Sequence, residues 1–248
     1  MREVKVKINY LYNSAFKLET ENHVLIFDYF LQTSDTKNKN ASDGIIGRED
    51  LTGNKPVYVF ASHSHPDHYN ESILKWKEVN PNIKYILSSD INIKNKTADM
   101  YTISVDETIS LDKVDIKAFG STDLGVSFLI KLDDITLFHA GDLNWWHWYD
   151  ESDEDNRMQE ENFKKEIEKL RNENIHIAFF PVDSRLKDSY ALGADYFIYN
   201  LKPQVFIPMH FREDYNITKE FSEKYKEIHT NILKISKKGQ EFNQLIQL

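Results

Sequence analysis

The sequence contains no cysteine among its 248 residues, which excludes disulfide bonds and thiolate metal sites. Any bound metal ion must therefore be held by nitrogen and oxygen donors. No run of eighteen apolar residues is present, and the first residues lack an apolar stretch of signal-peptide length. We therefore expect a soluble, cytoplasmic protein that has no membrane partner.

Basic residues are also scarce relative to acidic ones. The chain has 31 Lys and Arg against 40 Asp and Glu, a formal net charge of −9. A large nucleic-acid footprint needs a basic face, so we expect no nucleic-acid partner. A small anionic substrate is compatible with this charge, because a few local cations can override the net value.

Short apolar runs separated by helical patterns predict an α/β fold. The expected strands are residues 5–12, 23–28, 56–63, 83–88, 114–120, 125–132, 135–142, 175–183 and 204–210. The expected helices are residues 71–79, 158–174, 193–202 and 217–228. We interpret residues 33–44 as a polar loop and residues 150–157 as a solvated acidic loop. Since no low-complexity linker interrupts the chain, residues 1–248 are expected to form one domain.

Five apolar runs end on a residue that is able to bind a metal ion. These residues are Asp28, His63, Asp142, Asp183 and His210. The carboxyl ends of strands form the ligand-binding crevice in α/β sheets, because the loops there carry side chains on a rigid scaffold. Five such endings with nitrogen or oxygen donors indicate a common site.

The richest cluster of donors is the segment HSHPDH, which follows an apolar run. His63 and His65 alternate in an extended segment, so their side chains point the same way and are able to chelate one ion. The chain turns after Pro66, which directs Asp67 and His68 to a second ion nearby. The pattern therefore predicts a metal centre.

The HxHxDH pattern after a buried strand resembles the signature of the metallo-β-lactamase superfamily. The segments LFHAGD around Asp142 and IPMHF around His210 resemble the later metal motifs of that family, in the same order. The resemblance spans nearly the whole chain and is strongest to the branch of metal-dependent hydrolases that includes L-ascorbate-6-phosphate lactonase. It implies a four-layer αββα sandwich, in which two mixed β-sheets are flanked by helices.

The resemblance also implies roles for the candidate ligands. His63 and His65 would bind a first ion, and Asp142 would bridge it to a second ion bound by Asp67, His68 and His210. Zinc is the expected metal, as one or two ions, although the donors also suit Mn²⁺ or Fe²⁺. A metal ion lowers the pKa of a bound water from 15.7 to about 7 and so supplies hydroxide. Asp67, the expected catalytic residue, would hold that hydroxide in line and accept the proton that the water loses.

One departure from the family pattern concerns the third histidine of the first ion. Phe119, in the segment KAFGSTD, stands where relatives carry that histidine. Loss of a neutral donor should weaken the first site, unless another group replaces it. Three residues are candidates for this replacement donor: His147, Asp183 and Asp123. The alternative interpretation is a loop histidine for His147, a helix cap for Asp183 and a turn residue for Asp123.

Three other polar residues near these motifs have open interpretations. His139 either donates to a ligand carboxylate or is a satisfied core histidine. Asp28, which the family shares, is expected to orient ligand or backbone groups. Asn13 stands where relatives carry a histidine in a Gly-His-Ala-like turn, a second departure that we expect to alter substrate contacts.

The expected function is hydrolysis of a small ester, lactone or phosphoester. No G-x-S-x-G elbow, P-loop or dinucleotide-binding glycine pattern is present, so activated water is the nucleophile that the sequence supports. Arg185 and Arg212 are candidate clamps for an anionic substrate, or rim arginines. Trp145 and Trp146 either line the pocket or bury their loop against helices.

Two other functions remain open from the sequence. The Phe119 departure motivates a non-catalytic metal- or ligand-binding protein. An RNA-processing nuclease is the other enzyme considered, and the acidic charge balance counts against it. Relatives of this branch often self-associate, so a homo-oligomer is a further expectation.

Overall fold

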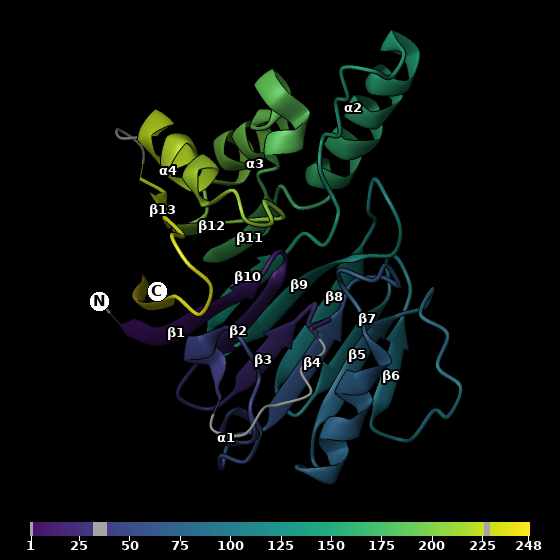
Figure 1. Ribbon diagram of the computed structural model, residues 1–248, viewed down its shortest axis with the longest axis vertical. Helices are drawn as coiled ribbons and strands as arrows, with labels where there is room; N and C mark the ends of the chain where they lie inside the picture. Colours follow the sequence, from purple (N-terminus) through teal and green to yellow (C-terminus); the bar gives the residue numbers. More distant parts are fainter. Residues whose placement is uncertain (1, 32–38, 226–228) are drawn as a thin grey trace. The chain divides into compact units, whose positions relative to one another are not determined.

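The structure is a computed structural model that describes residues 2–31, 39–225 and 229–248. The chain divides into two compact units (Figure 1). Unit 1 consists of Met1–Ser104 and Lys237–Leu248, and unit 2 consists of Val105–Ser236. Each unit contains one seven-stranded sheet. The single domain that the sequence predicts over residues 1–248 stays a prediction.

The sheet of unit 1 has the strand order β14-β1-β2-β3-β4-β5-β6. Strands β14 to β3 are antiparallel neighbours, and β3 to β6 are parallel neighbours. The strands are β1 (Glu3–Tyr12), β2 (Ala15–Glu19), β3 (Val24–Phe27), β4 (Val57–Ala61), β5 (Lys84–Ser88), β6 (Met100–Ile103) and β14 (Glu241–Gln247). The first six of these strands form the part of the sheet that lies before Ser104 in the sequence, and β14 returns to pair with β1.

The inner strands of unit 1 are buried on both faces. Every residue of β3 and β4 is buried, as expected for a continuous apolar run in the parallel part of a covered sheet. One face packs on short helical segments, with Ala41, Leu51 and Ile73 joining the apolar core. These segments are η1 (Ala41–Asp43), α1 (Arg48–Leu51) and η2 (Glu71–Glu78).

The sheet of unit 2 has the strand order β13-β12-β11-β10-β9-β8-β7. Strands β7 to β10 are antiparallel neighbours, and β10 to β13 are parallel neighbours. The strands are β7 (Thr108–Leu111), β8 (Val114–Phe119), β9 (Ser127–Leu132), β10 (Ile135–His139), β11 (Ile177–Pro181), β12 (Val205–Met209) and β13 (Asn231–Ile232). The helical elements are α2 (Asp153–Glu168), η3 (Ser184–Ser189), α3 (Leu192–Leu201) and α4 (Tyr215–Lys224).

Aromatic side chains join the long helices of unit 2 to its parallel strands. Phe197 of α3 stacks on Phe138 of β10 with ring centroids 5.4 Å apart, and contacts Phe180 of β11 in a tilted arrangement at 4.7 Å. Phe206 of β12 contacts Phe221 of α4 at 5.4 Å. Figure 1 shows α3 and α4 beside these strands. These helices cover one face of β10, β11 and β12, strands that are buried along their whole length.

The fold prediction is confirmed, because the chain has two mixed sheets with helices. All nine predicted strands are present, and the structure adds β2, β6, β7, β13 and β14. Among the described residues, no helix combines the length and apolar character needed to cross a bilayer.

The prediction of an acidic loop over residues 150–157 is wrong. Helix α2 begins at Asp153, five residues before the predicted start, and ends at Glu168. Ser152 caps the helix, its hydroxyl accepting a hydrogen bond from the Asp155 backbone N–H at 3.1 Å. Acidic residues in the first turn also stabilise the helix through its dipole, so here the acidic run is a helix start.

Other boundaries also differ from the prediction. The segment 71–79 forms a 3-10 helix, η2, and not an α-helix. Part of the predicted loop over residues 33–44 lies outside the described residues, and so does the end of the predicted helix 217–228. The described part of the loop contains η1, and the described part of the helix is α4.

Candidate metal centre

In unit 1, the candidate ligands follow two neighbouring parallel strands. Asp28 comes directly after β3, and the segment from Ser62 to His68 comes directly after β4. Because parallel strands end at the same edge of a sheet, residues 34 or more positions apart in the sequence meet there. The sheet therefore supplies a rigid base for the histidine cluster.

Asp28 is the buried acceptor that orders this cluster. Its Oδ1 accepts a hydrogen bond from the Ser62 backbone N–H at 2.7 Å, and its Oδ2 accepts from Ser62 Oγ and His68 Nδ1, both at 2.7 Å. Since a carboxylate accepts from Nδ1–H, the proton of His68 is on Nδ1, and the Nε2 lone pair is the donor that a metal would use. Asp28 has a positive φ of 43°, a conformation that is uncommon for residues other than glycine and that concentrates at functional sites.

Ser62 links Asp28 to the first histidine of the motif. Its Oγ lies 3.0 Å from His63 Nδ1 and donates its own proton to Asp28, so His63 Nδ1–H is the donor of that contact. Ser62 was not among the predicted site residues. Its position between a strand end and the HxHxDH motif was the signal that could have identified it.

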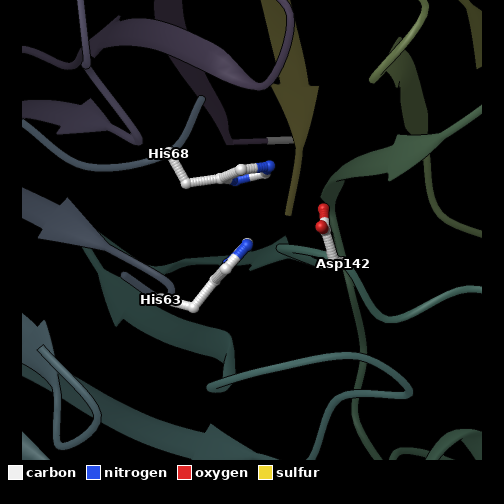
Figure 2. A group of neighbouring side chains, drawn as sticks. All are labelled: His63, His68 and Asp142. Atoms are coloured by element: carbon white, nitrogen blue, oxygen red, sulfur yellow. The ribbon is translucent and has the colours of Figure 1, made fainter. Parts of the chain in front are cut away.

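His63 and His65 have adjacent donor atoms, as the alternation of the motif predicts. His63 Nε2 lies 3.0 Å from His65 Nδ1, close to the separation of about 3.3 Å that two nitrogen ligands of one tetrahedral zinc ion would have. The His63 ring also packs on the His68 ring, with centroids 4.1 Å apart. Figure 2 draws His63 and His68 with their rings pointing in the same direction.

Asp67 is partly exposed, with 39% of its side chain accessible, whereas the neighbouring His68 is fully buried. Its Oδ2 accepts a hydrogen bond from Asn13 Nδ2 at 3.3 Å and lies 3.9 Å from His68 Nε2. The carboxylate is therefore held beside the expected donor atom of His68 and still faces solvent. This is a suitable environment for a residue that handles a proton.

In unit 2, candidate residues follow three neighbouring parallel strands. Asp142 comes three residues after β10, Asp183 two residues after β11 and His210 directly after β12. Asp142 is drawn in Figure 2. His210 Nε2 lies 3.4 Å from Asp142 Oδ1, so these two candidate ligands are neighbours within the unit.

The backbone around Asp142 is fixed by its own loop. Its carbonyl oxygen accepts hydrogen bonds from Trp146 Nε1 at 3.0 Å and from Thr122 Oγ1 at 3.3 Å. Gly141, with a φ of 54°, makes the turn before it, and its N–H donates to His139 Nδ1 at 3.2 Å. His139 is fully buried and thus supports the turn that presents Asp142.

Asp183 holds His210 and is itself held by Arg185. Its Oδ2 accepts from His210 Nδ1 at 2.9 Å, and Arg185 Nε donates to both carboxylate oxygens at 3.0 Å. Burial alone would raise the pKa of Asp183, but the hydrogen bonds and charges of His210 and Arg185 lower the pKa to about 2. Asp183 also caps η3 by accepting from the Arg185 backbone N–H at 3.0 Å, as the helix-cap alternative predicts.

The tryptophans after Asp142 have different surroundings. Trp146 is buried, and its ring contacts that of His210 edge-on with centroids 5.5 Å apart. Trp145 instead packs against α2 and α3, with Phe163 at 6.3 Å and Tyr196 at 6.4 Å. Trp146 therefore remains a candidate wall of the site, whereas the surroundings of Trp145 favour the packing alternative.

Two arginines, one histidine and one aspartate complete the set of predicted site residues. The guanidinium of Arg185 lies over the Trp148 ring at 5.5 Å, in addition to its contacts with Asp183. Arg212 is exposed, with a positive φ of 54°, two residues after His210. His147 is half-buried on the loop after Asp142, and Asp123 is exposed.

Phe119 is buried in unit 2. It ends β8, has 1% of its surface exposed, and Lys117 Nζ lies 4.6 Å from its ring centroid. A phenyl ring offers no lone pair to a metal ion. The departure that the sequence shows therefore persists in the structure as a position without a donor.

The donor chemistry fits a divalent metal ion. The candidate ligands are His63, His65, Asp67 and His68 on unit 1 and Asp123, Asp142 and His210 on unit 2. All are nitrogen or oxygen donors, and His68 and His210 each have a carboxylate on Nδ1, which is the usual second partner of a metal-binding histidine. Zinc, manganese and iron all suit such a set, so the residues do not fix the metal.

Comparison with family models gives a match to the β-lactamase superfamily domain over residues 7–158. The chain belongs to the metallo-β-lactamase superfamily. The matched segment contains the HxHxDH motif and Asp142, whereas the third motif of the resemblance, around His210, lies beyond it. Comparison with curated protein sequences gives no match.

Solved structures agree on the fold. Igni18, a metallo hydrolase from Ignicoccus hospitalis, is 18% identical, with a TM-score of 0.67 over 97% of this chain and 98% of that chain. A protein from Parabacteroides distasonis, assigned as a metal-dependent hydrolase, is 15% identical, with a TM-score of 0.61 over 93% and 92%. CmlA, a diiron β-hydroxylase from Streptomyces venezuelae, is 11% identical, with a TM-score of 0.60 over 98% of this chain and 54% of that chain. The fold is thus that of the metallo-hydrolases of this superfamily.

Proposed function

We propose that this protein is a metal-dependent hydrolase of a small ester, lactone or phosphoester. The observation that carries the proposal is the ordered histidine cluster after β4. In this cluster Ser62 and Asp28 form hydrogen bonds with Nδ1 of His63 and of His68, respectively. A buried carboxylate on Nδ1, which leaves Nε2 as the donor atom, is the usual second partner of a metal-binding histidine. Family membership supplies the first partner, a metal ion.

The residues are proposed to act as follows. By the family resemblance, His63 and His65 would hold one ion, Asp67, His68 and His210 would hold a second, and Asp142 would serve both. A divalent ion held by these residues would make hydroxide available at neutral pH and polarise the bond under attack. Asp67 orients the attacking water and accepts its proton on the carboxylate, whose partial exposure lets the proton pass to solvent.

We propose zinc as the first choice of metal, with Mn²⁺ or Fe²⁺ as alternatives. Phe119 removes a neutral nitrogen donor from the first ion, which weakens that position relative to the second. One tightly held ion and one weakly held ion per chain is the expected stoichiometry.

The substrate is proposed to be small and anionic. Arg212 is exposed and follows the proposed ligand His210 by two residues, so it is a candidate for binding a phosphate or carboxylate. The charge of Arg185 is already engaged by Asp183. Trp146, beside His210, supplies an apolar wall. These features suit a phosphorylated lactone, as in the L-ascorbate-6-phosphate lactonase branch.

A second candidate function rests on Phe119. A centre with one donor missing would bind an ion or ligand without turning substrate over, which makes the protein a binding protein. An RNA-processing nuclease is a weaker candidate, because the chain carries a net charge of −9.

Metal analysis combined with a substrate panel tests the proposal. Protein purified without chelators is analysed by mass spectrometry for bound metals. It is then assayed with p-nitrophenyl acetate, γ-lactones, a phosphomonoester and bis(p-nitrophenyl) phosphate. We expect at least one equivalent of metal and turnover of one substrate class. Asp67→Ala and His210→Ala should reduce both readouts.

Two buried histidines outside the motifs serve as matched controls. His23 lies in unit 1 and His176 in unit 2, and their replacement by asparagine should leave metal content and turnover unchanged. Wild-type protein without metal would contradict the proposal. Bound metal without turnover, together with activity in Phe119→His, would favour the binding protein instead. Light scattering during the same purification tests the expected homo-oligomer.

A further inference from the structure

Asn13 occupies a turn between β1 and β2 with its side chain and backbone both fixed. It is buried, with 1% of its surface exposed, and has a positive φ of 53°. Its backbone N–H donates to the hydroxyl of Tyr10 at 2.9 Å, and Tyr10 is itself fully buried. Asparagine is among the few residues that adopt this left-handed conformation at low cost. The turn therefore sets the direction of the Asn13 side chain.

The amide of Asn13 contacts the proposed catalytic carboxylate. Its Nδ2 donates to Asp67 Oδ2 at 3.3 Å. Rotating the amide by half a turn would bring its carbonyl oxygen against the same carboxylate, which is repulsive, so the amide nitrogen is the atom that faces Asp67. The contact joins residues 54 positions apart and lies entirely within unit 1.

The other amide atom of Asn13 remains unsatisfied. Within the part of the chain that the structure describes, the buried Oδ1 has no hydrogen-bond partner. Buried polar atoms without partners are rare in folded proteins and call for an explanation beyond packing. The orientation of the side chain thus satisfies Nδ2, which binds Asp67, and leaves Oδ1 without a hydrogen bond.

We infer that Asn13 is a positioning residue for Asp67. The inference rests on the proposed function, in which Asp67 is a metal ligand and handles a proton. An aspartate that is 39% exposed on a loop samples several rotamers. By binding Oδ2, the Asn13 amide restricts the carboxylate to one orientation, in which Oδ2 lies 3.9 Å from the proposed donor atom, His68 Nε2. Asn13 does not itself touch the ion or the substrate in this role.

The test is a double-mutant cycle read out as affinity for Zn²⁺. Asn13→Gly removes the amide and keeps the left-handed turn, because glycine adopts a positive φ without strain. The dissociation constant for Zn²⁺ is measured by competition with a chromophoric chelator in wild type, Asn13→Gly, Asp67→Ala and the double variant. We expect Asn13→Gly to weaken Zn²⁺ binding about 10-fold or more, and to have no further effect once Asp67 is alanine.

Asn9 provides a matched control in the preceding strand. It is buried, and its Nδ2 donates to a carboxylate, Glu241 Oε2 at 3.5 Å, that is not a proposed ligand. Asn9→Gly should lower the melting temperature without changing the Zn²⁺ dissociation constant. Asn13→His restores a ring N–H donor in a residue that tolerates this conformation, and should recover part of the lost affinity.

A second measurement does not depend on the folding of an Asn13 variant. In ¹⁵N-labelled protein, the side-chain amide signals of Asn13 should shift in Asp67→Ala, whereas those of Asn9 should not. Equal loss of Zn²⁺ affinity from Asn13→Gly in both backgrounds, or unshifted Asn13 signals, would overturn the inference while the hydrolase proposal stands. Wild-type protein that binds no Zn²⁺ would overturn both.

Discussion

Replacing Asp183 by asparagine removes a buried charge without changing the shape of the side chain. Asp183 is 1% exposed and contacts His210 at 2.9 Å and Arg185 at 3.0 Å. The variant keeps an oxygen that is able to accept from His210 but loses the negative charge that both partners stabilise. It therefore isolates the electrostatic part of this network.

The lowered pKa of Asp183 gives the size of the effect. The pKa falls from its ordinary value of 3.8 to about 2, a difference of about 1.8 units. At about 1.4 kcal/mol for each unit, the ionised group contributes roughly 2 kcal/mol to the free energy of unfolding. Because the folded-state pKa is the lower one, this stabilisation is present above pH 3.8 and is lost as the pH falls through 2.

Urea unfolding of the metal-free protein tests this reasoning. At pH 7, Asp183→Asn should unfold with a free energy about 2 kcal/mol lower than that of the wild type, and roughly half of that difference should remain at pH 3. Asp188→Asn is the matched control, since Asp188 is exposed on the same short helix. A difference that stays constant from pH 7 to pH 3, or equal effects of the two substitutions, would refute the assignment of Asp183.

Three further predictions follow from the contacts described above. Asp28→Asn leaves His68 Nδ1 without its carboxylate and should weaken Zn²⁺ binding about 10- to 100-fold in chelator competition. Binding that stays unchanged would exclude an orienting role. Gly193→Ala places a Cβ 2.1 Å from Asn144 Oδ1 and should lower the free energy of unfolding by about 1–3 kcal/mol, whereas Gly53→Ala, with nothing within 4 Å, should not. Equal stabilities would contradict the packing at Gly193. Removal of metal by EDTA should lower the melting temperature, and Zn²⁺ at 100 times its dissociation constant should restore about 2.7 kcal/mol. A melting temperature that is insensitive to both treatments would argue against a site in the folded state.

The inner strands and the residues at their ends were predictable because the parallel part of each sheet is buried on both faces. Burial on both faces demands an unbroken apolar run, and such runs mark β4 and β11 in the sequence. A polar residue that ends such a run lies at the carboxyl end of its strand, where ligands bind in sheets of this kind. His63 and His210 were identified in this way. The same pattern located Asp28, whose contacts with Ser62 and His68 the sequence could not specify.

Elements with one exposed face were harder to predict. Strand β14 alternates between exposed and partly buried residues and is fixed by its pairing with β1, more than 230 positions away. Its sequence contains no continuous apolar run, so only the tertiary pairing defines it. The start of α2 was missed for a different reason, because an acidic run is compatible with a loop and with the first turn of a helix. The Ser152 cap decides between these, and its hydrogen bond to Asp155 is a local contact that charge alone does not reveal.

The two units order their proposed ligand histidines in the same way. In unit 1, Asp28 at the end of β3 accepts from Nδ1 of His68, which follows the neighbouring strand β4. In unit 2, Asp183 after β11 accepts from Nδ1 of His210, which follows the neighbouring strand β12. In both cases the carboxylate fixes the tautomer that leaves Nε2 as the metal donor. Each imidazole ring is thus oriented by a carboxylate of its own unit before any ion binds. Binding of an ion at the proposed site would therefore not carry the entropic cost of ordering either ring.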